Sequence, residues 1–554
     1  MSAILSADTL NDFIAPSVAC IKPVETLPPP PPSNELAVSV ESDKPSPNDA
    51  KTTAQISLTD CLACSGCVTS SEAVLVSMQS HNEVLDVLSR HRADKKFVAL
   101  LSPQTRAALA VAVGVGESEA GNMVSDLLYG LGFEWVVDTN PFRKISLHYA
   151  AEEVVGIDNE EERKNKPVLA SSCPGFICYL ESTHPELIPH LSNLKSPQAI
   201  AGTFIKAMMV GEGKIEGPGG VYVVAVMPCF DKKLEGSRGE LTSTAWKGES
   251  EGEPVRDVDC VITTRELLLL AEARGVRFSA MRRTPLPIPL ISSDPAIQAF
   301  LTTPTPNGPN SVGSSGGSLM RIISTLIMKH PNATLRIQQG RNVDTLDYIL
   351  VLPSGETVAK LSRCYGFRNI QNLVRRLKPS KAKTLPRLGG SRGPGAAAPT
   401  PTAGIVAAAR RAAAKRAGAG VDDKALYVEV MACPGGCTNG GGQLKWDDDA
   451  LWKELGMEPA SHRELLAKVD EAYYSANEED DDAPPPGGMS VQLMHSIQKE
   501  REEVVDVVQR WSKIAGVAED KLTRTTYRKV ANDIGNRLGE KEVLEMASRN
   551  GGGW

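Results

Sequence analysis

The sequence predicts an α/β fold with largely buried sheets, and three observations support this prediction. Short apolar runs alternate from residue 95 onward with segments that have apolar residues at helical spacing, which is the pattern of strands covered by helices. Several cysteines directly follow the apolar runs, where open α/β sheets bind their ligands. The 554 residues are 41% apolar and 23% charged, which fits a mainly globular chain of several domains of about 150 residues each.

Each expected element follows from this pattern. The apolar runs predict strands, in chain order, at 97–101, 133–138, 166–170, 222–226, 258–263, 345–352 and 425–431. The segments with helical spacing predict helices at 104–113, 121–129, 141–155 and 265–273. Near the carboxyl terminus, apolar side chains at helical spacing predict one more helix that packs on the body: Ile497, Val504, Val508 and Trp511.

Composition divides the chain into four regions. They are an irregular amino-terminal segment, two α/β lobes and a carboxyl-terminal region with an acidic linker and a helix: 1–94, 95–250, 251–475 and 476–554. Low-complexity inserts interrupt the second lobe at 303–318 and 379–420. Such segments cannot bury a core, so we interpret them as solvated linkers. The basic composition of 375–420 leaves a nuclear-import or partner-binding role as the alternative.

Charge, hydropathy and cysteine content narrow the class of protein. The net charge of −7 argues against nucleic acid or an anionic membrane as the main partner. No apolar run approaches the roughly 20 residues that span a bilayer, and the amino terminus lacks a secretion signal, so a cytoplasmic protein is expected. Because thiols stay reduced in that compartment, clusters among the 11 cysteines indicate metal ligands rather than disulfides.

Three cysteines lie close together near the amino terminus, at Cys61, Cys64 and Cys67. A loop with this spacing can bind three corners of a cubane 4Fe–4S cluster, whose iron prefers soft sulfur ligands. Ser71 stands where a bacterial ferredoxin would continue with its fourth cysteine. Cys20, which lies beyond a flexible proline-rich stretch, is the candidate fourth ligand, with an incidental thiol as the alternative. A zinc site that uses two of the three clustered cysteines also remains open.

Four further cysteines stand in short motifs that follow expected strands. Cys173 lies in SSCPG, Cys229 lies in MPCFDKKLE, and Cys433 and Cys437 lie in ACPGGCTNGGGQ. The glycines let the backbone approach closely and donate N–H groups toward a negatively charged thiolate cluster. Each adjacent proline fixes a turn and removes a competing donor. We interpret these segments as the ligands of a second cluster.

These three segments resemble the signature motifs of iron-only hydrogenases, in the same order and at comparable separations, from about residue 95 to residue 445. The resemblance implies two α/β lobes with a cluster-bearing cleft, preceded by a small irregular segment that binds its own cluster. In hydrogenases the four matching cysteines bind the 4Fe–4S part of the active-site cluster, and the one that matches Cys437 also bridges to a two-iron unit. Lys232 and Glu235 match the lysine and glutamate that follow the second motif.

The departures from the hydrogenase pattern concern proton transfer. Ser172 occupies the position of a cysteine that passes protons to the two-iron unit, and a serine hydroxyl is far too weak an acid for this at neutral pH. Met320, after Gly316 and Gly317, stands where a glutamate of the proton path is expected. Loss of the relay with retention of the cluster ligands argues against hydrogen turnover.

This combination resembles the eukaryotic hydrogenase-like family of cytosolic iron–sulfur assembly factors, also called nuclear prelamin A recognition factor-like proteins. The resemblance implies a non-catalytic protein that links early scaffold proteins to a late targeting complex with a WD40-propeller subunit, for the maturation of cytosolic and nuclear client apo-proteins. It also implies a cytoplasmic location, with the nucleus as an additional location. It assigns two 4Fe–4S clusters, one to Cys20, Cys61, Cys64 and Cys67, and one to Cys173, Cys229, Cys433 and Cys437.

Three smaller features complete the sequence-based expectations. Trp554 resembles the aromatic tail by which clients and adaptors of the targeting complex are recognised, with an unbound terminus as the alternative. Thr525–Tyr527 resembles a Thr-x-Tyr region of the same family. Cys178, Cys260 and Cys364 lack a partner at ligand spacing and are expected as buried hydrophobic side chains.

Two other functions compete with the assembly role. The main alternative is an iron-only hydrogenase or another redox enzyme that uses the second cluster site. A weaker alternative is a zinc-binding interaction protein. The sequence contains no glycine-rich phosphate-binding loop followed by lysine, so a nucleotide-hydrolysing scaffold of the assembly pathway is excluded.

Overall fold

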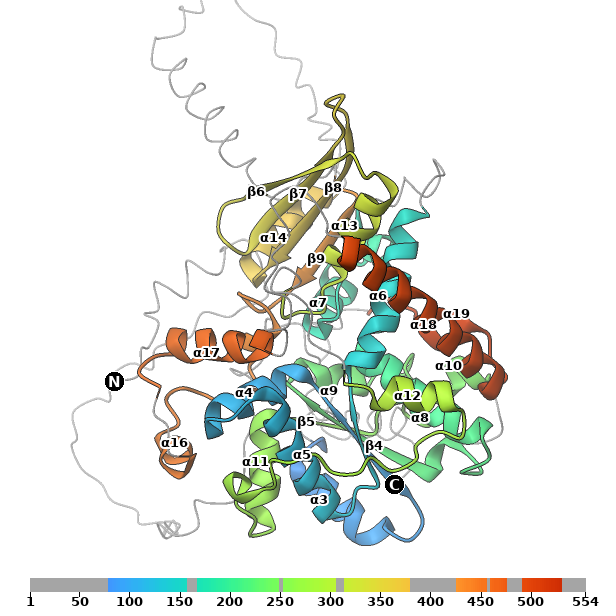
Figure 1. The fold of residues 1–554 in the computed structure, drawn as a ribbon, viewed down its shortest axis with the longest axis vertical. Helices are drawn as coiled ribbons and strands as arrows, with labels where there is room; N and C mark the ends of the chain where they lie inside the picture. The colour runs from blue at the N-terminus through green and yellow to red at the C-terminus, as the bar shows by residue number, and fades with distance from the viewer. Residues whose placement is uncertain are drawn as a thin grey trace, which may run out of the picture.

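The computed structural model describes residues 78–156, 167–248, 253–304, 313–378, 425–455, 459–475 and 491–530 (Figure 1). Within them the chain forms two α/β lobes, each with its own sheet. Several features predicted from the sequence lie outside the described residues: Cys20, the Cys61–Cys67 triplet, the insert at 379–420, the acidic linker and Trp554.

The first lobe is built on a four-stranded parallel sheet with the order β2-β1-β4-β5. Its strands are β1 (Lys96–Leu101), β2 (Trp135–Asp138), β4 (Val221–Met227) and β5 (Cys260–Thr263). Every residue of β4 is buried, as expected for a central strand of a parallel sheet with helices on both faces.

Helices cover both faces of this sheet. One face packs against α3 (His81–His91), α4 (Pro103–Val113), α5 (Glu117–Leu131) and α11 (Thr264–Ala273). The opposite face packs against α6 (Asn140–Val155), α8 (Pro197–Gly211), α12 (Pro295–Thr302) and α18 (Val491–Ala515). The predicted carboxyl-terminal docking helix is thus confirmed as α18. Its buried Trp511 packs on Phe204 of α8, with 4.6 Å between the ring centroids.

The second lobe is built on a five-stranded mixed sheet with the order β3-β9-β8-β7-β6. Its strands are β3 (Val168–Ala170), β6 (Thr334–Gln339), β7 (Thr345–Val351), β8 (Thr357–Tyr365) and β9 (Tyr427–Met431). The β3, β9 and β8 strands run parallel, whereas β8, β7 and β6 form an antiparallel meander. This sheet packs against α7 (Pro174–Thr183) and α14 (Phe367–Leu377) on one side and against α6 and α13 (Ser318–Lys329) on the other.

Shorter elements connect and cover the lobes. They are η3 (Pro185–His190), η4 (Pro218–Gly220), α9 (Asp231–Gly236), α10 (Ser243–Lys247), η5 (Phe278–Ala280), η7 (Cys437–Asn439), α16 (Asp449–Leu455), α17 (His462–Tyr474) and α19 (Glu519–Thr523). The α17 helix packs on α4 and η7, and α19 packs on α8 and α18. Among the described residues, we find no helix with the length and apolar character needed to cross a membrane.

The predicted two-lobed α/β fold is confirmed, and each predicted strand and helix overlaps an observed one. The lobes are interleaved along the chain, however, and so differ from the contiguous regions 95–250 and 251–475. The β3 strand lies in the second sheet, although its position predicted the first lobe, and β5 lies in the first sheet. The long α6 helix contributes side chains to the cores of both lobes, so the chain passes from one lobe to the other within this helix.

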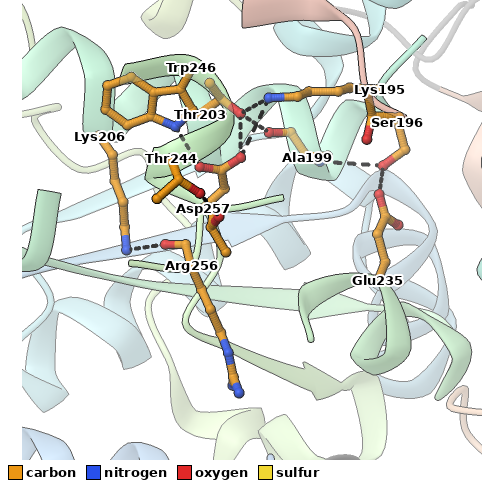
Figure 2. A network of polar contacts seen from close by, with 12 residues as sticks. Lys195, Ser196, Ala199, Thr203, Lys206, Glu235, Thr244, Trp246, Arg256 and Asp257 are labelled. Carbon is orange, nitrogen blue, oxygen red and sulfur yellow. Dashed lines mark hydrogen bonds and ion pairs between the residues drawn. The ribbon is translucent and has the colours of Figure 1, made fainter. Parts of the chain in front are cut away.

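A buried polar network fixes the start of α8, which follows the crossing from the second lobe to the first (Figure 2). The Asp257 carboxylate lies 2.8 Å from both Thr203 Oγ1 and Trp246 Nε1. The Lys195 ammonium donates a hydrogen bond to Thr203 Oγ1 at 2.8 Å and lies 3.5 Å from the same carboxylate. Burial lowers the pKa of Lys195, and the attraction of Asp257 partly opposes that shift. The charged pair therefore ties the crossing to the core of the first lobe.

Candidate metal centre

Four cysteines meet between the two lobes. Cys173 follows β3, Cys229 follows β4, and Cys433 follows β9, with Cys437 at the start of η7. All four line one cavity of about 70 Å³. Cys229 comes from the first lobe and the other three come from the second, so the cavity exists only where the lobes join.

Without a bound cation, the environment of the cavity favours the protonated form of these sulfurs. Burial raises the pKa of the Cys173 thiol to about 12, and it raises the pKa of Cys437 as well. Burial and the nearby cysteine sulfurs hold the pKa values of Cys229 and Cys433 well above the ordinary value for a thiol. Four thiolates in one cavity would need bound cations to be stable, and the iron of a cluster would supply them. The donor set of four converging sulfurs therefore fits a 4Fe–4S cluster.

The glycine-rich segment after β9 lets the two lobes approach each other at the cavity. A Cβ atom added at Gly440 would collide with the backbone carbonyl of Pro228, the residue before Cys229. The Gly442 N–H donates a hydrogen bond to the same carbonyl oxygen at 2.9 Å. Gly436 has a φ of 116°, which L side chains rarely adopt, and an added Cβ there would lie 2.5 Å from Ser314 Oγ. Larger residues at these positions would push the cysteine motifs apart.

Two serine side chains position the cysteine backbones. The Cys437 N–H donates to Ser315 Oγ at 3.0 Å, and the Cys173 N–H donates to Ser171 Oγ at 3.1 Å. The Ser171 hydroxyl in turn donates to the Val430 carbonyl at 2.6 Å, which joins the motif after β3 to the neighbouring β9 strand. Sequence reasoning did not single out Ser315; its place directly before the Gly316-Gly317 pair was the available signal.

Lys232 and Glu235, the two residues that match the hydrogenase pattern after the second motif, form an ion pair on α9. The Ser196 hydroxyl lies within hydrogen-bond distance of both, at 3.1 Å from Lys232 Nζ, and Figure 2 shows its contact with Glu235. Lys232 also lines the cavity. The pair anchors α9, and with it the Cys229 segment, to the cap of α8.

The two positions that depart from the hydrogenase pattern lie in different environments. Ser172 lines the cavity, and its hydroxyl is 3.5 Å from the Ser315 carbonyl oxygen. Met320 lies on α13 and packs among the apolar side chains between that helix and the second sheet. A thioether carries no exchangeable proton, and an unassisted serine hydroxyl does not ionise near neutral pH. The arrangement offers no acid of suitable strength at either position.

The remaining described cysteines lie away from the cavity. Cys178, Cys260 and Cys364 are buried, with at most 7% of their surface exposed, as predicted for hydrophobic side chains. Across the described ranges, no three His, Cys, Asp or Glu groups are close enough together to bind a single metal ion. A cubane takes one thiolate at each of its four iron corners, so its ligands are spread more widely than those of one ion. The four cysteines line one cavity without forming such a single-ion site, and a cubane is the group whose ligands this arrangement can accommodate.

The comparisons with known proteins agree with this geometry. A family model described as the iron only hydrogenase large subunit, C-terminal domain, matches residues 95–441. The FeFe-hydrogenase HydA1 of Chlamydomonas reinhardtii superposes with a TM-score of 0.53 at 19% identity and covers 81% of this chain and 99% of its own. The hydrogenase HydA(deltaEFG) gives a TM-score of 0.52 with the same coverage. At this identity the structures share the fold alone, and the fold and motifs together define a hydrogenase-like iron–sulfur protein.

Curated relatives narrow the family further. The proteins named cytosolic Fe-S cluster assembly factor NAR1 from Botryotinia fuckeliana and from Sclerotinia sclerotiorum are each 45% identical over 600 residues, with 100% of both chains covered. The protein of that name from Penicillium rubens is 44% identical over 624 residues with the same coverage. The chain belongs to the family of cytosolic Fe–S cluster assembly factors.

Proposed function

We propose that the chain carries two 4Fe–4S clusters and acts as a non-catalytic assembly and adaptor protein in the maturation of cytosolic and nuclear iron–sulfur proteins. One observation supports this proposal above the others. Four cysteines, two of them buried and two partly exposed, line one cavity between the lobes, while Ser172 in the same cavity lacks the acidity of a proton relay. The names of the full-length relatives support the same role.

We assign the second cluster to Cys173, Cys229, Cys433 and Cys437. The four cysteines line one cavity, and hydrogen bonds hold the backbone N–H groups of Cys173 and Cys437. Close glycine packing holds the Cys229 and Cys437 segments together. A 4Fe–4S cluster supplies one-electron redox chemistry, or cargo for transfer, when it is bound. This chain's own residues position the four cysteines, bury Cys173 and Cys433, and place Lys232 at the same cavity.

We assign the first cluster to the amino-terminal quartet of Cys20, Cys61, Cys64 and Cys67. The argument for this site is the spacing of the triplet together with the family relationship, because these residues lie outside the described ranges. Three of the ligands lie within one short loop, so their positions do not depend on contacts between distant parts of the chain. This cluster is therefore expected to be lost more slowly than the second.

The proposed partners are early scaffold proteins, a late targeting complex with a WD40-propeller subunit, and client apo-proteins. The support is the family of assembly factors to which the chain belongs, whose members are named cytosolic. Trp554 is the proposed contact for the targeting complex, because a single aromatic side chain can form a compact binding determinant. Removal of Trp554 should weaken capture of the purified targeting complex and leave the iron content unchanged.

A hydrogen assay separates the assembly role from the alternative, a hydrogenase or other redox enzyme. The anaerobically purified protein with reduced viologen should evolve no hydrogen above the rate of a matched Cys433→Ala control. The variant Ser172→Cys/Met320→Glu restores the two proton-relay residues and so tests whether their absence is the reason that no hydrogen evolves. Appreciable hydrogen evolution by the unaltered chain would overturn the assembly proposal.

A further inference from the structure

Two of the cavity cysteines depend on a pair of short helices that belong to different lobes. Cys173 is the N-cap residue of α7, which follows β3 of the second sheet. Cys229 lies two residues before α9, which follows β4 of the first sheet. The two helices contact each other directly. Any motion that separates α7 from α9 therefore also separates the sulfur of one lobe from those of the other.

A buried ion pair joins the last turn of α7 to the chain directly after α9, whereas Cys173 and Cys229 lie at the starts of these helices. The Arg238 guanidinium, two residues after α9, donates two hydrogen bonds to the Glu181 carboxylate of α7, at 2.9 and 2.6 Å. The Glu181 side chain is 3% exposed and the Arg238 side chain 11%. This fork geometry fixes both distance and orientation, which a single contact would not do.

The chain after α19 covers this ion pair and is bonded to it. We call residues 523–530 the carboxyl-terminal strap. The strap begins on the first lobe, where Leu522 is fully buried in its core, and ends on α7, where the Val530 N–H donates to the Glu181 carbonyl at 3.1 Å. The Arg528 N–H donates to Glu181 Oε1 at 2.9 Å. The Arg238 guanidinium lies 5.9 Å from the centre of the Tyr527 ring.

Further bonds fix the strap along the segment that crosses between the lobes. The Thr525 N–H donates to the Asn193 carbonyl at 2.8 Å, and the Tyr527 hydroxyl donates to the Ser192 carbonyl at 2.7 Å. The Lys195 N–H donates to the Thr523 carbonyl at 2.9 Å. The strap thus contacts both lobes, the crossing segment and the ion pair, although nothing in it reaches the cavity.

We propose that Glu181, Arg238 and the carboxyl-terminal strap form an inter-lobe clamp that keeps Cys173 and Cys229 at cluster-binding distance and so sets how fast the second cluster is lost. These are positioning residues, because they act through α7 and α9 rather than by touching the cluster. The clamp lies at the only boundary that the four-cysteine site crosses, so opening it uncouples one ligand from the other three. The proposal rests on the proposed assignment of the second cluster.

Two truncations test the strap with a matched control. A chain that ends at Val530 keeps the strap, whereas a chain that ends at Leu522 lacks it, and neither retains Trp554. In holoprotein purified without oxygen, a ferrous chelator should remove second-cluster iron at least about tenfold faster from the shorter chain. Equal rates for the two chains would overturn the role of the strap.

Glu181→Gln tests the ion pair, with Lys206→Met as its control. Lys206 is also fully buried and lies 2.7 Å from Asp259, but this pair lies within the first lobe. Glu181→Gln should speed amide hydrogen exchange in α7 and α9 and speed cluster loss, while first-cluster iron stays bound. Lys206→Met should speed exchange in the first-lobe core and leave the rate of cluster loss near that of the unaltered chain.

The exchange readout keeps this proposal separable from the assignment of the cluster. If Glu181→Gln changes neither exchange in α7 and α9 nor cluster loss, the clamp is wrong. If both control and test variants lose the second cluster equally fast, the effect is general destabilisation and the clamp is again wrong. If the unaltered chain holds no second-cluster iron, the proposed function fails, and exchange in α7 and α9 alone then decides whether the clamp joins the lobes.

Discussion

The two lobes differ in how their sheets are buried and in how much each contributes to the cavity. All four strands of the first sheet run parallel, and all seven residues of β4 are buried. In the second sheet the meander ends in β6, where five of six residues are exposed. The first lobe contributes only Cys229, whereas the second contributes three cysteines from the segments that follow the parallel strands β3 and β9. The cavity therefore belongs to the parallel, buried part of each sheet.

This difference shows why the lobes must stay joined. The second lobe holds three of the four sulfurs, which is one too few for a cubane with a thiolate at every corner. The missing sulfur comes from the first lobe, directly after its fully buried strand β4. Contacts between the lobes thus decide whether the site is complete, and the following predictions test that dependence.

Loss of one sulfur from either lobe should have the largest effect. Cys229→Ala and Cys433→Ala should each remove about half of the iron, because one cluster of the two needs all four thiolates. Both variants should lose the same electron paramagnetic resonance signal, although the residues lie in different lobes. Iron quantitation after anaerobic purification, with spectra of the reduced proteins, checks this.

Cys260→Ala is the matched control for these variants. Cys260 is fully buried in the first sheet, but it does not line the cavity. The iron content of Cys260→Ala should equal that of the unaltered chain. Iron loss in this variant, or full iron retention in Cys433→Ala, would contradict the ligand assignment.

Loss of a buried lysine should lower the free energy of unfolding more in the first lobe than in the second. Lys233 is fully buried, and its ammonium lies 2.7 Å from both the Glu266 carboxylate and the Gln79 carbonyl oxygen. Lys233→Met leaves Glu266 buried without its cation and should lower the free energy of unfolding by about 3–5 kcal/mol. Lys360→Met in the second lobe should cost clearly less, because the ion pair of Lys360 with Asp347 is partly exposed. Denaturant unfolding of both variants measures the difference.

The sequence predicted the buried part of each sheet better than the exposed part. The apolar run of β4, VYVVAVM, identifies a strand directly. The β8 strand, TVAKLSRCY, has polar residues between apolar ones, and β6, TLRIQQ, is largely polar, so neither forms an apolar run. These strands depend on pairing with neighbours rather than on their own composition. The same reasoning assigned β3 to the wrong lobe, since chain order does not reveal which sheet a strand joins.

The candidate site shows the same division. Local motifs identified the four cavity cysteines, because proline and glycine beside a cysteine are visible in the sequence. The ion pair of Glu181 with Arg238 joins residues 57 positions apart, and Tyr527 reaches the Ser192 carbonyl across 335 positions. Such contacts form only when the lobes fold together, so no local sequence pattern predicts them.

Acid should weaken the helix that both lobes share. His148 lies buried on α6, and burial lowers its pKa, opposed by the nearby Glu152. A histidine whose pKa is lower in the folded state stabilises the fold above its unfolded value of about 6.5, and that stability is lost as the pH falls through the folded value. The urea concentration at which half of the protein is unfolded should therefore decrease as the pH is lowered below about 6.5. His148→Gln should reduce this pH dependence; an unchanged slope would contradict the role given to His148.

Substitution on the exposed edge of the second sheet should have the smallest effect. Ile337 of β6 is 62% exposed. Ile337→Thr keeps a β-branched side chain and should change the free energy of unfolding by less than about 0.5 kcal/mol, with unchanged iron content. A loss of more than about 2 kcal/mol would show that the edge strand is packed more tightly than its exposure indicates.

Iron and acid-labile sulfide per chain, measured after purification without oxygen from iron-replete cells, test the central claim most directly. Two cubane clusters, one on the amino-terminal quartet and one between the lobes, predict about eight irons and about eight sulfides. A chain that binds about four of each, or that binds zinc in their place, would contradict the two-cluster account.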